Sequence, residues 1–136
     1  MAARFLLDTN ICIYIRQKRP PEVLARFERL KVGDAGLSVI TYGELYYGAA
    51  KSPHRLQAME KLDHLMNYLS VLPLPDTAAN SYGEIRAALE AKGQTLGGND
   101  LWIAAHAKAA GLILVTNNEK EFKRVPGLKV QNWAAA

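Results

Sequence analysis

The chain has 136 residues, of which 49% are hydrophobic and 22% are charged, and its formal net charge is +4. This composition is that of a folded globular protein and argues against an intrinsically disordered chain. The length predicts a single domain, residues 1–136, that is large enough to bury a hydrophobic core. The modest positive charge fits an acidic partner such as nucleic acid without establishing one.

The sequence indicates neither membrane insertion nor secretion. No apolar run approaches the roughly 20 residues that a membrane-spanning helix needs, and no charged start leads into a long apolar segment. The single cysteine, Cys12, lies in an apolar stretch and is expected to pack in the core. A chain that cannot form an internal disulfide suits a reducing compartment, so we expect a cytoplasmic protein.

Short apolar runs alternate with segments of helical character along the whole chain. Strands are expected at residues 4–7, 35–40, 71–74, 112–116 and 129–133. Helices are expected at residues 10–17, 21–30, 41–49, 52–69, 75–92, 99–111 and around Phe122. This alternation predicts an α/β fold in which helices cover both faces of a mostly parallel sheet of about five strands. Pro73 predicts an edge position or an early end for the third strand.

Two groups of residues are expected to be structural. The first is an apolar stripe at helical spacing, which predicts core packing rather than cofactor binding. Its members are Leu56, Met59, Leu62, Leu65, Met66 and Leu69. The second comprises His54, His64 and His106, which lack the paired spacing of a zinc site and are expected on the surface or in the core.

Three acids follow predicted strands or begin the helices after them. Asp8 directly follows the first strand, Glu44 is expected in the first turn after the second strand, and Asp100 begins a later helix. Strand carboxyl ends and the following helix amino ends share one edge of a parallel sheet, so these carboxylates are expected to converge. Close carboxylates repel one another unless a cation offsets their charge. Oxygen ligands favour Mg²⁺ or Mn²⁺, which can activate water and hold a phosphate.

Each acid also has a purely structural explanation that the sequence leaves open. Asp8 could simply cap the next helix, and Asp100 could be stabilised by a helix dipole. Thr41 and Glu44 have the spacing of a capping box, in which Glu44 would reach back to the Thr41 amide. Amide substitutions separate the explanations, because Asn and Gln retain a cap but remove the charge that a metal needs.

Four blocks of sequence, taken in order, carry a resemblance to a known family. They are Leu7-Asp8-Thr9-Asn10, residues 38–45 with Gly48, Gly97-Gly98-Asn99-Asp100 with residues 103–107, and residues 114–118 with Phe122 and residues 125–128. Together they resemble the PIN-domain ribonucleases, and more narrowly the VapC toxins of bacterial toxin-antitoxin pairs. The resemblance spans residues 6–133, which is nearly the whole chain.

The resemblance implies a PIN-like fold and a metal-dependent endoribonuclease that hydrolyses the phosphodiester backbone of structured RNA, such as tRNA or ribosomal RNA loops. By the same likeness, Asp8, Glu44 and Asp100 would hold Mg²⁺ or Mn²⁺. The family further implies a VapB-type antitoxin that covers the site, and a homodimer. No contact with a membrane is implied.

The resemblance also assigns residues around the three acids. Thr9, Asn10 and Thr116 would support the site. Many PIN domains have a fourth acid where this chain has Asn118, whose amide can bind water but adds no charge. Whether Asn118 or the neighbouring Glu119 takes the fourth catalytic position stays open. Basic residues at 16–19 and 120–124, together with Arg86, are expected to contact RNA phosphates.

Two other functions stay open at this point. A haloacid-dehalogenase-type, Mg²⁺-dependent phosphatase also has an Asp after its first strand, but it needs a second Asp where this chain has Asn10. A non-catalytic RNA- or protein-binding module would retain the sheet without turnover. RNA cleavage that is lost in Asp8→Asn identifies the nuclease, and a phosphomonoester assay identifies the phosphatase.

Overall fold

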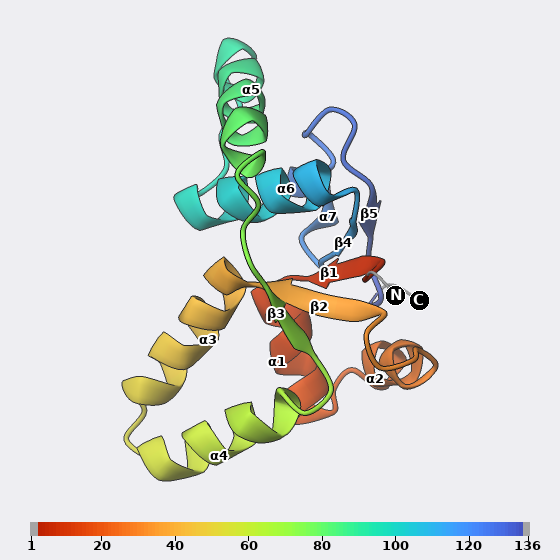
Figure 1. Ribbon diagram of the computed structural model, residues 1–136, viewed down its shortest axis with the longest axis vertical. Coiled ribbons are helices and arrows are strands. Elements are labelled where there is room, and N and C mark those ends of the chain that lie inside the picture. The colour runs from red at the N-terminus through yellow and green to blue at the C-terminus, as the bar shows by residue number, and fades with distance from the viewer. Residues whose placement is uncertain (1–2, 135–136) are drawn as a thin grey trace.

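The computed structural model describes residues 3–134, in which five parallel strands form one sheet (Figure 1). The strands are β1 (Phe5–Leu7), β2 (Ala35–Ser38), β3 (Ser70–Leu72), β4 (Ile113–Val115) and β5 (Val130–Gln131). The helices are α1 (Thr9–Gln17), α2 (Pro21–Glu28), α3 (Val39–Ala50), α4 (Arg55–Leu65), α5 (Ala78–Ala91), α6 (Gly98–Ala110) and α7 (Glu119–Phe122). The strand order is β3-β2-β1-β4-β5, which confirms the parallel sheet and the edge position of β3.

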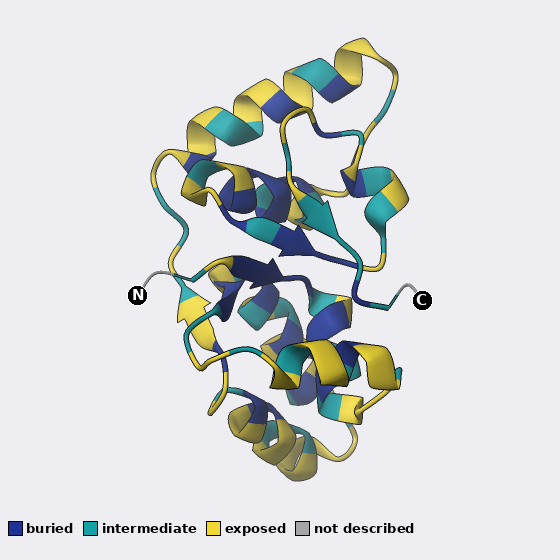
Figure 2. Ribbon diagram, turned by 90° about the vertical axis from the view of Figure 1, so that its right-hand side faces the viewer, coloured by how far each residue is buried: buried dark blue, intermediate teal, exposed yellow. Residues whose placement is uncertain are grey.

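The central strand β1 separates two hydrophobic cores. Successive residues of a strand point to opposite faces of the sheet. Phe5 and Leu7 pack with α1 to α4 on one face, and Leu6 packs with α5 to α7 on the other. Figure 2 shows buried strands at the centre of the sheet, an exposed edge strand β3, and helices whose outer faces are exposed. Cys12 is buried among the α1 to α4 residues, as expected. Within the described residues, no helix is long and apolar enough to cross a bilayer.

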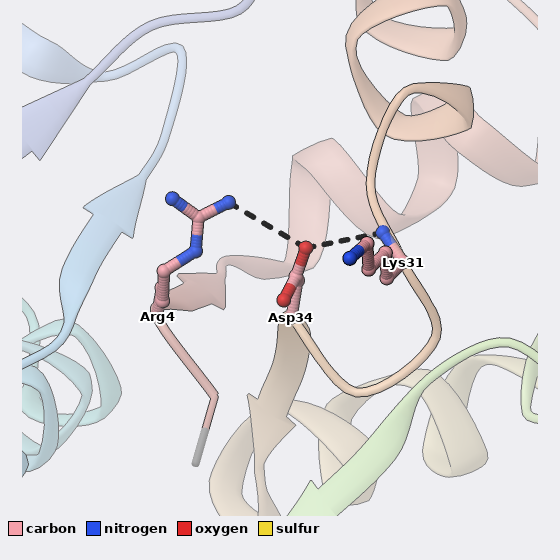
Figure 3. Close-up of polar contacts among 3 residues, drawn as sticks. All are labelled: Arg4, Lys31 and Asp34. Atoms are coloured by element: carbon pink, nitrogen blue, oxygen red, sulfur yellow. Dashed lines mark hydrogen bonds and ion pairs between the residues drawn. The ribbon is translucent and has the colours of Figure 1, made fainter. Parts of the chain in front are cut away.

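Asp34 aligns the starts of β1 and β2 (Figure 3). Its carbonyl accepts hydrogen bonds from the Arg4 amide at 2.8 Å and the Phe5 amide at 3.0 Å. Its Oδ2 accepts from the Lys31 amide at 3.0 Å and lies 3.5 Å from Nη2 of Arg4. The Arg4 side chain is exposed, so this ion pair contributes little. The backbone bonds fix the register that places Phe5 beside Ala35, and the two strands therefore end at the same edge.

The boundary between β2 and α3 differs from the expected one. The strand ends at Ser38 and the helix begins at Val39, because the Ser38 hydroxyl accepts a hydrogen bond from the Ile40 amide and caps the helix. The expected capping box at Thr41 and Glu44 is therefore wrong. Thr41 lies inside the helix, buried, and its hydroxyl has no hydrogen-bond partner among the described residues. Glu44 lies in the second turn rather than the first.

The apolar stripe of the fourth helix is only partly in the core. Leu62, Leu65 and Leu69 are buried, but Leu56 is 81% exposed, so its expected core position is wrong. The helix α4 begins at Arg55 rather than near residue 52, and the hydrophobic core reaches only as far as Ala58 and Met59. The first turn of α4 therefore projects beyond the core.

Gly36 in β2 leaves no room for a side chain. A Cβ atom there would lie 2.9 Å from the Ser70 carbonyl oxygen and 3.0 Å from Leu72 side-chain atoms in β3. We expect Gly36→Ala to lower the free energy of unfolding by about 1–3 kcal/mol, measured by urea denaturation. The control is Gly83→Ala in α5, where nothing lies within 4 Å of the new Cβ and helix propensity favours alanine. Equal unfolding midpoints for the two variants would contradict this account.

Candidate active site

Asp8 occupies the carboxyl end of the central strand and is only 7% exposed. Its Oδ1 accepts a hydrogen bond from the Ile11 amide at 3.0 Å, so Asp8 does cap α1. The hydroxyl of Thr116, which follows β4, donates to the same carboxylate. Burial raises the pKa of Asp8 to about 6, although both hydrogen bonds lower it in part. The neighbouring ends of β1 and β4 mark the point where the strand order reverses, which is where open parallel sheets bind ligands.

Glu44 and Asp100 are brought to Asp8 by two different helices. The negative charges of Asp100 and Glu44 both raise the pKa of Asp8 beyond the effect of burial. The pKa of Asp100 is itself raised, first by burial and then by the charge of Glu44. Each pair among the three carboxylates therefore interacts, and they share one side of the molecule. Glu44 is held in place by the Thr9 hydroxyl, which donates to its Oε1 at 2.8 Å.

The three carboxylates do not form a ready-made coordination shell. Across residues 3–134, no three His, Cys, Asp or Glu side chains form a group that could hold a metal ion as they lie. One oxygen of Asp8 faces the Ile11 amide, and one oxygen of Glu44 faces the Thr9 hydroxyl. The three side chains nevertheless fit a hard divalent cation. Every donor atom is a carboxylate oxygen, and the negative charges repel one another unless a cation lies between them. A bound ion would therefore require these side chains to turn toward it.

A polar rim surrounds the carboxylates between α1 and the end of β4. The Asn10 amide donates to Asn117 Oδ1 at 3.5 Å, and the Asn117 amide donates to the Tyr14 hydroxyl at 2.6 Å. The Asn118 backbone amide donates to the Thr116 hydroxyl at 3.0 Å, while its side chain makes no cap for α7. Thr9 and Thr116 thus contact the acids directly, whereas Asn10 belongs to the exposed rim.

Sequence reasoning missed Glu121 on the one-turn helix α7. Its negative charge raises the pKa of Asp100, so a fourth carboxylate lies near Asp100. Glu119, considered from the sequence, instead pairs with Lys123 at 3.3 Å. The available signal was the position of Glu121 three residues after Asn118 and directly before the buried Phe122. A helical turn anchored by Phe122 presents these two acids in different directions.

Arg86 is less available for phosphate binding than the sequence suggested. Its guanidinium donates to Glu90 Oε2 at 3.0 Å and to the Tyr82 hydroxyl at 2.9 Å, all on α5. The exposed Lys120 on α7 has no ion pair among the described residues and suits phosphate contacts better, whereas the exposed Lys18 and Arg19 follow α1 at the end away from Asp8. Basic side chains of this kind position a nucleic acid without reading its sequence.

A groove with a volume of about 1220 Å³ leads away from the carboxylates between α1, α2, α3 and α4. Thr9 and Glu44 form part of its lining, so the groove opens at the candidate site. Farther along, apolar residues such as Leu24 and Phe27 alternate with the charged Arg16 and Lys61. A surface of this kind fits an extended or helical peptide with both apolar and polar groups.

The comparisons with known proteins assign the family. A model of the PIN domain matches residues 5–128. The chain belongs to the PIN-domain family. Ribonuclease VapC2 from Haemophilus influenzae is 42% identical to this PIN domain over 130 residues, which cover 96% of this chain and 98% of the relative. The tRNA(fMet)-specific endonuclease VapC from Shigella flexneri is 40% identical, covering 96% and 98% of the two chains.

Solved structures place this PIN domain among the VapC proteins. VapBC2 from Rickettsia felis, crystallised with a DNA fragment from its promoter, contains a chain with a TM-score of 0.88 and 41% identity, covering 95% of this chain and 98% of that one. DNA-bound VapBC from Salmonella typhimurium gives a TM-score of 0.89 and 39% identity, covering 96% and 98%. The PIN-like fold expected from the sequence is confirmed.

The raised pKa of Asp8 predicts that this PIN domain is destabilised by its own carboxylate. Below about pH 4 the group is protonated in both the folded and unfolded states, and above about pH 6 the folded protein must ionise a buried acid. The free energy of unfolding therefore falls as the pH rises from about 4 to about 6, because the stabilising protonated form of Asp8 is lost. The shift from 3.8 to about 6 corresponds to roughly 3 kcal/mol.

We expect Asp8→Asn, which retains a helix cap, to unfold at higher urea concentration than the unaltered protein at pH 8 in EDTA, and at a similar concentration at pH 4. Asp63→Asn changes an exposed acid on α4 and serves as the control. A difference between Asp8→Asn and the unaltered protein that does not change with pH would refute the explanation.

Proposed function

We propose that this PIN domain is the toxin of a VapBC-type pair and acts as an endoribonuclease that depends on Mg²⁺ or Mn²⁺. The carrying observation is the meeting of Asp8, Glu44 and Asp100 at one edge of the sheet, where their charges interact. The relatives named as ribonucleases and as tRNA(fMet)-specific endonucleases support the same activity.

Three carboxylates would bind a divalent ion directly, and a fourth would act only through its charge. Asp8, Glu44 and Asp100 would bind it, and Glu121 would add negative charge beside Asp100. A bound ion activates water and offsets the charge that develops on the attacked phosphate. Thr9 orients Glu44, and Thr116 orients Asp8 in its ionised form. Asn118 and Asn10 have neutral amides that donate and accept hydrogen bonds, so they would contact water or substrate at the rim rather than neutralise the ion.

Structured RNA is the proposed substrate, with transfer RNA as the first candidate. The VapC relatives from Shigella flexneri and Salmonella typhimurium are named tRNA(fMet)-specific endonucleases, and they are 40% and 39% identical to this chain. Exposed basic residues after the C-terminal end of α1 and on α7 would contact phosphates of the bound RNA.

A VapB-type antitoxin is the proposed protein partner. The similar solved structures from Rickettsia felis and Salmonella typhimurium are VapBC assemblies. The groove between α1 and α4 opens at Glu44 and Thr9, so a peptide seated in it would cover the carboxylates. Such a partner would inhibit the enzyme by blocking access of RNA.

Glu44→Gln and Asp100→Asn test the nuclease directly. The first variant retains an acceptor for the Thr9 hydroxyl and the second nearly retains the size of the side chain, so both are expected to fold. We expect cleavage of a tRNA transcript in Mg²⁺ to fall by about 100-fold or more, because each variant lacks a charge needed for metal binding. Glu84→Gln on an exposed position of α5 is the control and should cleave normally. Full activity in both site variants would defeat the proposal.

The affinity for Mn²⁺ should depend on the protonation of Asp8. Since burial raises the pKa of Asp8 to about 6, the proton and the ion compete for this carboxylate below that pH. Isothermal titration is expected to show a dissociation constant that rises up to about tenfold per pH unit below pH 6 and levels off above pH 7. An affinity that is constant between pH 5 and pH 7 would exclude Asp8 as a ligand.

A further inference from the structure

A buried polar pair joins two of the elements that carry the carboxylates. The Nδ1 atom of His106 on α6 lies 2.9 Å from the hydroxyl oxygen of Ser38 at the end of β2. The two residues are 1% and 0% exposed. Within residues 3–134, this is the only side-chain hydrogen bond between α6 and the segment formed by β2 and α3. Ile40 of α3 also packs against the hydrophobic core to which α6 contributes.

The Ser38 hydroxyl can take part in two hydrogen bonds at once. The Ser38 oxygen already accepts a hydrogen bond from the Ile40 amide at 3.1 Å, so its own hydrogen can be donated to His106. In that direction the imidazole is neutral and has its lone pair on Nδ1. Burial lowers the pKa of His106, which favours the neutral form. One hydroxyl therefore caps α3 and anchors it to α6 at the same time.

The position of the pair relates it to the active site. Asp100 precedes His106 by six residues on α6, and Glu44 follows Ser38 by six residues on α3. Six residues of helix span about 9 Å. The Ser38–His106 contact therefore joins the start of α3 to α6 at a point about 9 Å along each helix axis from Glu44 and Asp100. The interaction between the charges of Glu44 and Asp100 agrees with this arrangement.

We propose that His106 is a positioning residue, which acts through Ser38 to set the separation between Glu44 and Asp100. This inference rests on the proposed function, because the separation matters for holding a divalent ion. A buried imidazole costs more to desolvate than an apolar side chain of similar size. The neighbours of His106 on α6, including Ile103, Ala105 and Ala107, are apolar and buried, so packing alone calls for another apolar residue at this position.

The test measures Mn²⁺ affinity by isothermal titration on the full chain at pH 7.5. His106→Leu removes the hydrogen bond and is expected to weaken Mn²⁺ binding about tenfold, the lower end of the effect of residues that orient metal ligands. His106→Asn retains an acceptor close to the position of Nδ1 and is expected to bind within about threefold of the unaltered protein. Ser38→Ala should weaken binding as His106→Leu does, and the double variant should be no weaker than the single ones.

A matched control separates positioning from general loosening of the fold. Leu89→Ala removes a buried side chain of α5, away from the link, and is expected to lower the melting temperature at least as much as His106→Leu. Its Mn²⁺ affinity should be unchanged. Equal weakening of Mn²⁺ binding in Leu89→Ala and His106→Leu would overturn the inference.

The remaining outcomes are also decisive. If His106→Leu binds Mn²⁺ like the unaltered protein, the positioning role is wrong while the nuclease proposal stands. If Asp100→Asn leaves Mn²⁺ affinity unchanged in the same assay, the carboxylates do not hold the ion and both proposals fail. If His106→Leu does not fold, Ser38→Ala decides, and unchanged Mn²⁺ affinity in that variant overturns the role.

Discussion

The burial of a negative charge at the end of β1 is the constraint on which the rest of the structure depends. Asp8 directly follows the buried central strand β1, and among residues 3–134 only the Ile11 amide and the Thr116 hydroxyl donate hydrogen bonds to its carboxylate. Two further carboxylates approach it and increase the cost of ionisation. The buried charge lowers the stability of the folded protein, and a cation bound to it would restore that stability.

Rigid elements, rather than loops, hold the interacting groups in place. Asp8 directly follows β1, which is hydrogen-bonded to β2 on one side and to β4 on the other. Glu44 and Asp100 belong to helices of 12 and 13 residues. The hydroxyl of Thr9 joins the start of α1 to α3, and Ser38 joins α3 to α6. The positions of the acids are therefore determined by the packing of the whole domain.

The features that were readable from the sequence are those with a local cause. The apolar runs determine the strands, Pro73 marks the edge strand, and Asp8 follows the first strand directly. The start of α3 was misplaced because the β-branched residues after Ser38 favour a strand, whereas the Ser38 cap starts the helix there. The approach of Glu121 to Asp100 and the pairing of His106 with Ser38 were not readable, because these contacts join segments that are distant in the sequence and are created only by the packed fold.

The two hydrophobic cores on opposite faces of the sheet give the site a mechanical role. Glu44 belongs to a helix packed mainly in one core, and Asp100 belongs to a helix of the other, with Asp8 on the strand between them. An ion that bound all three would fasten the two halves together and merge them into one cooperative unit, in which neither half could open alone without releasing it.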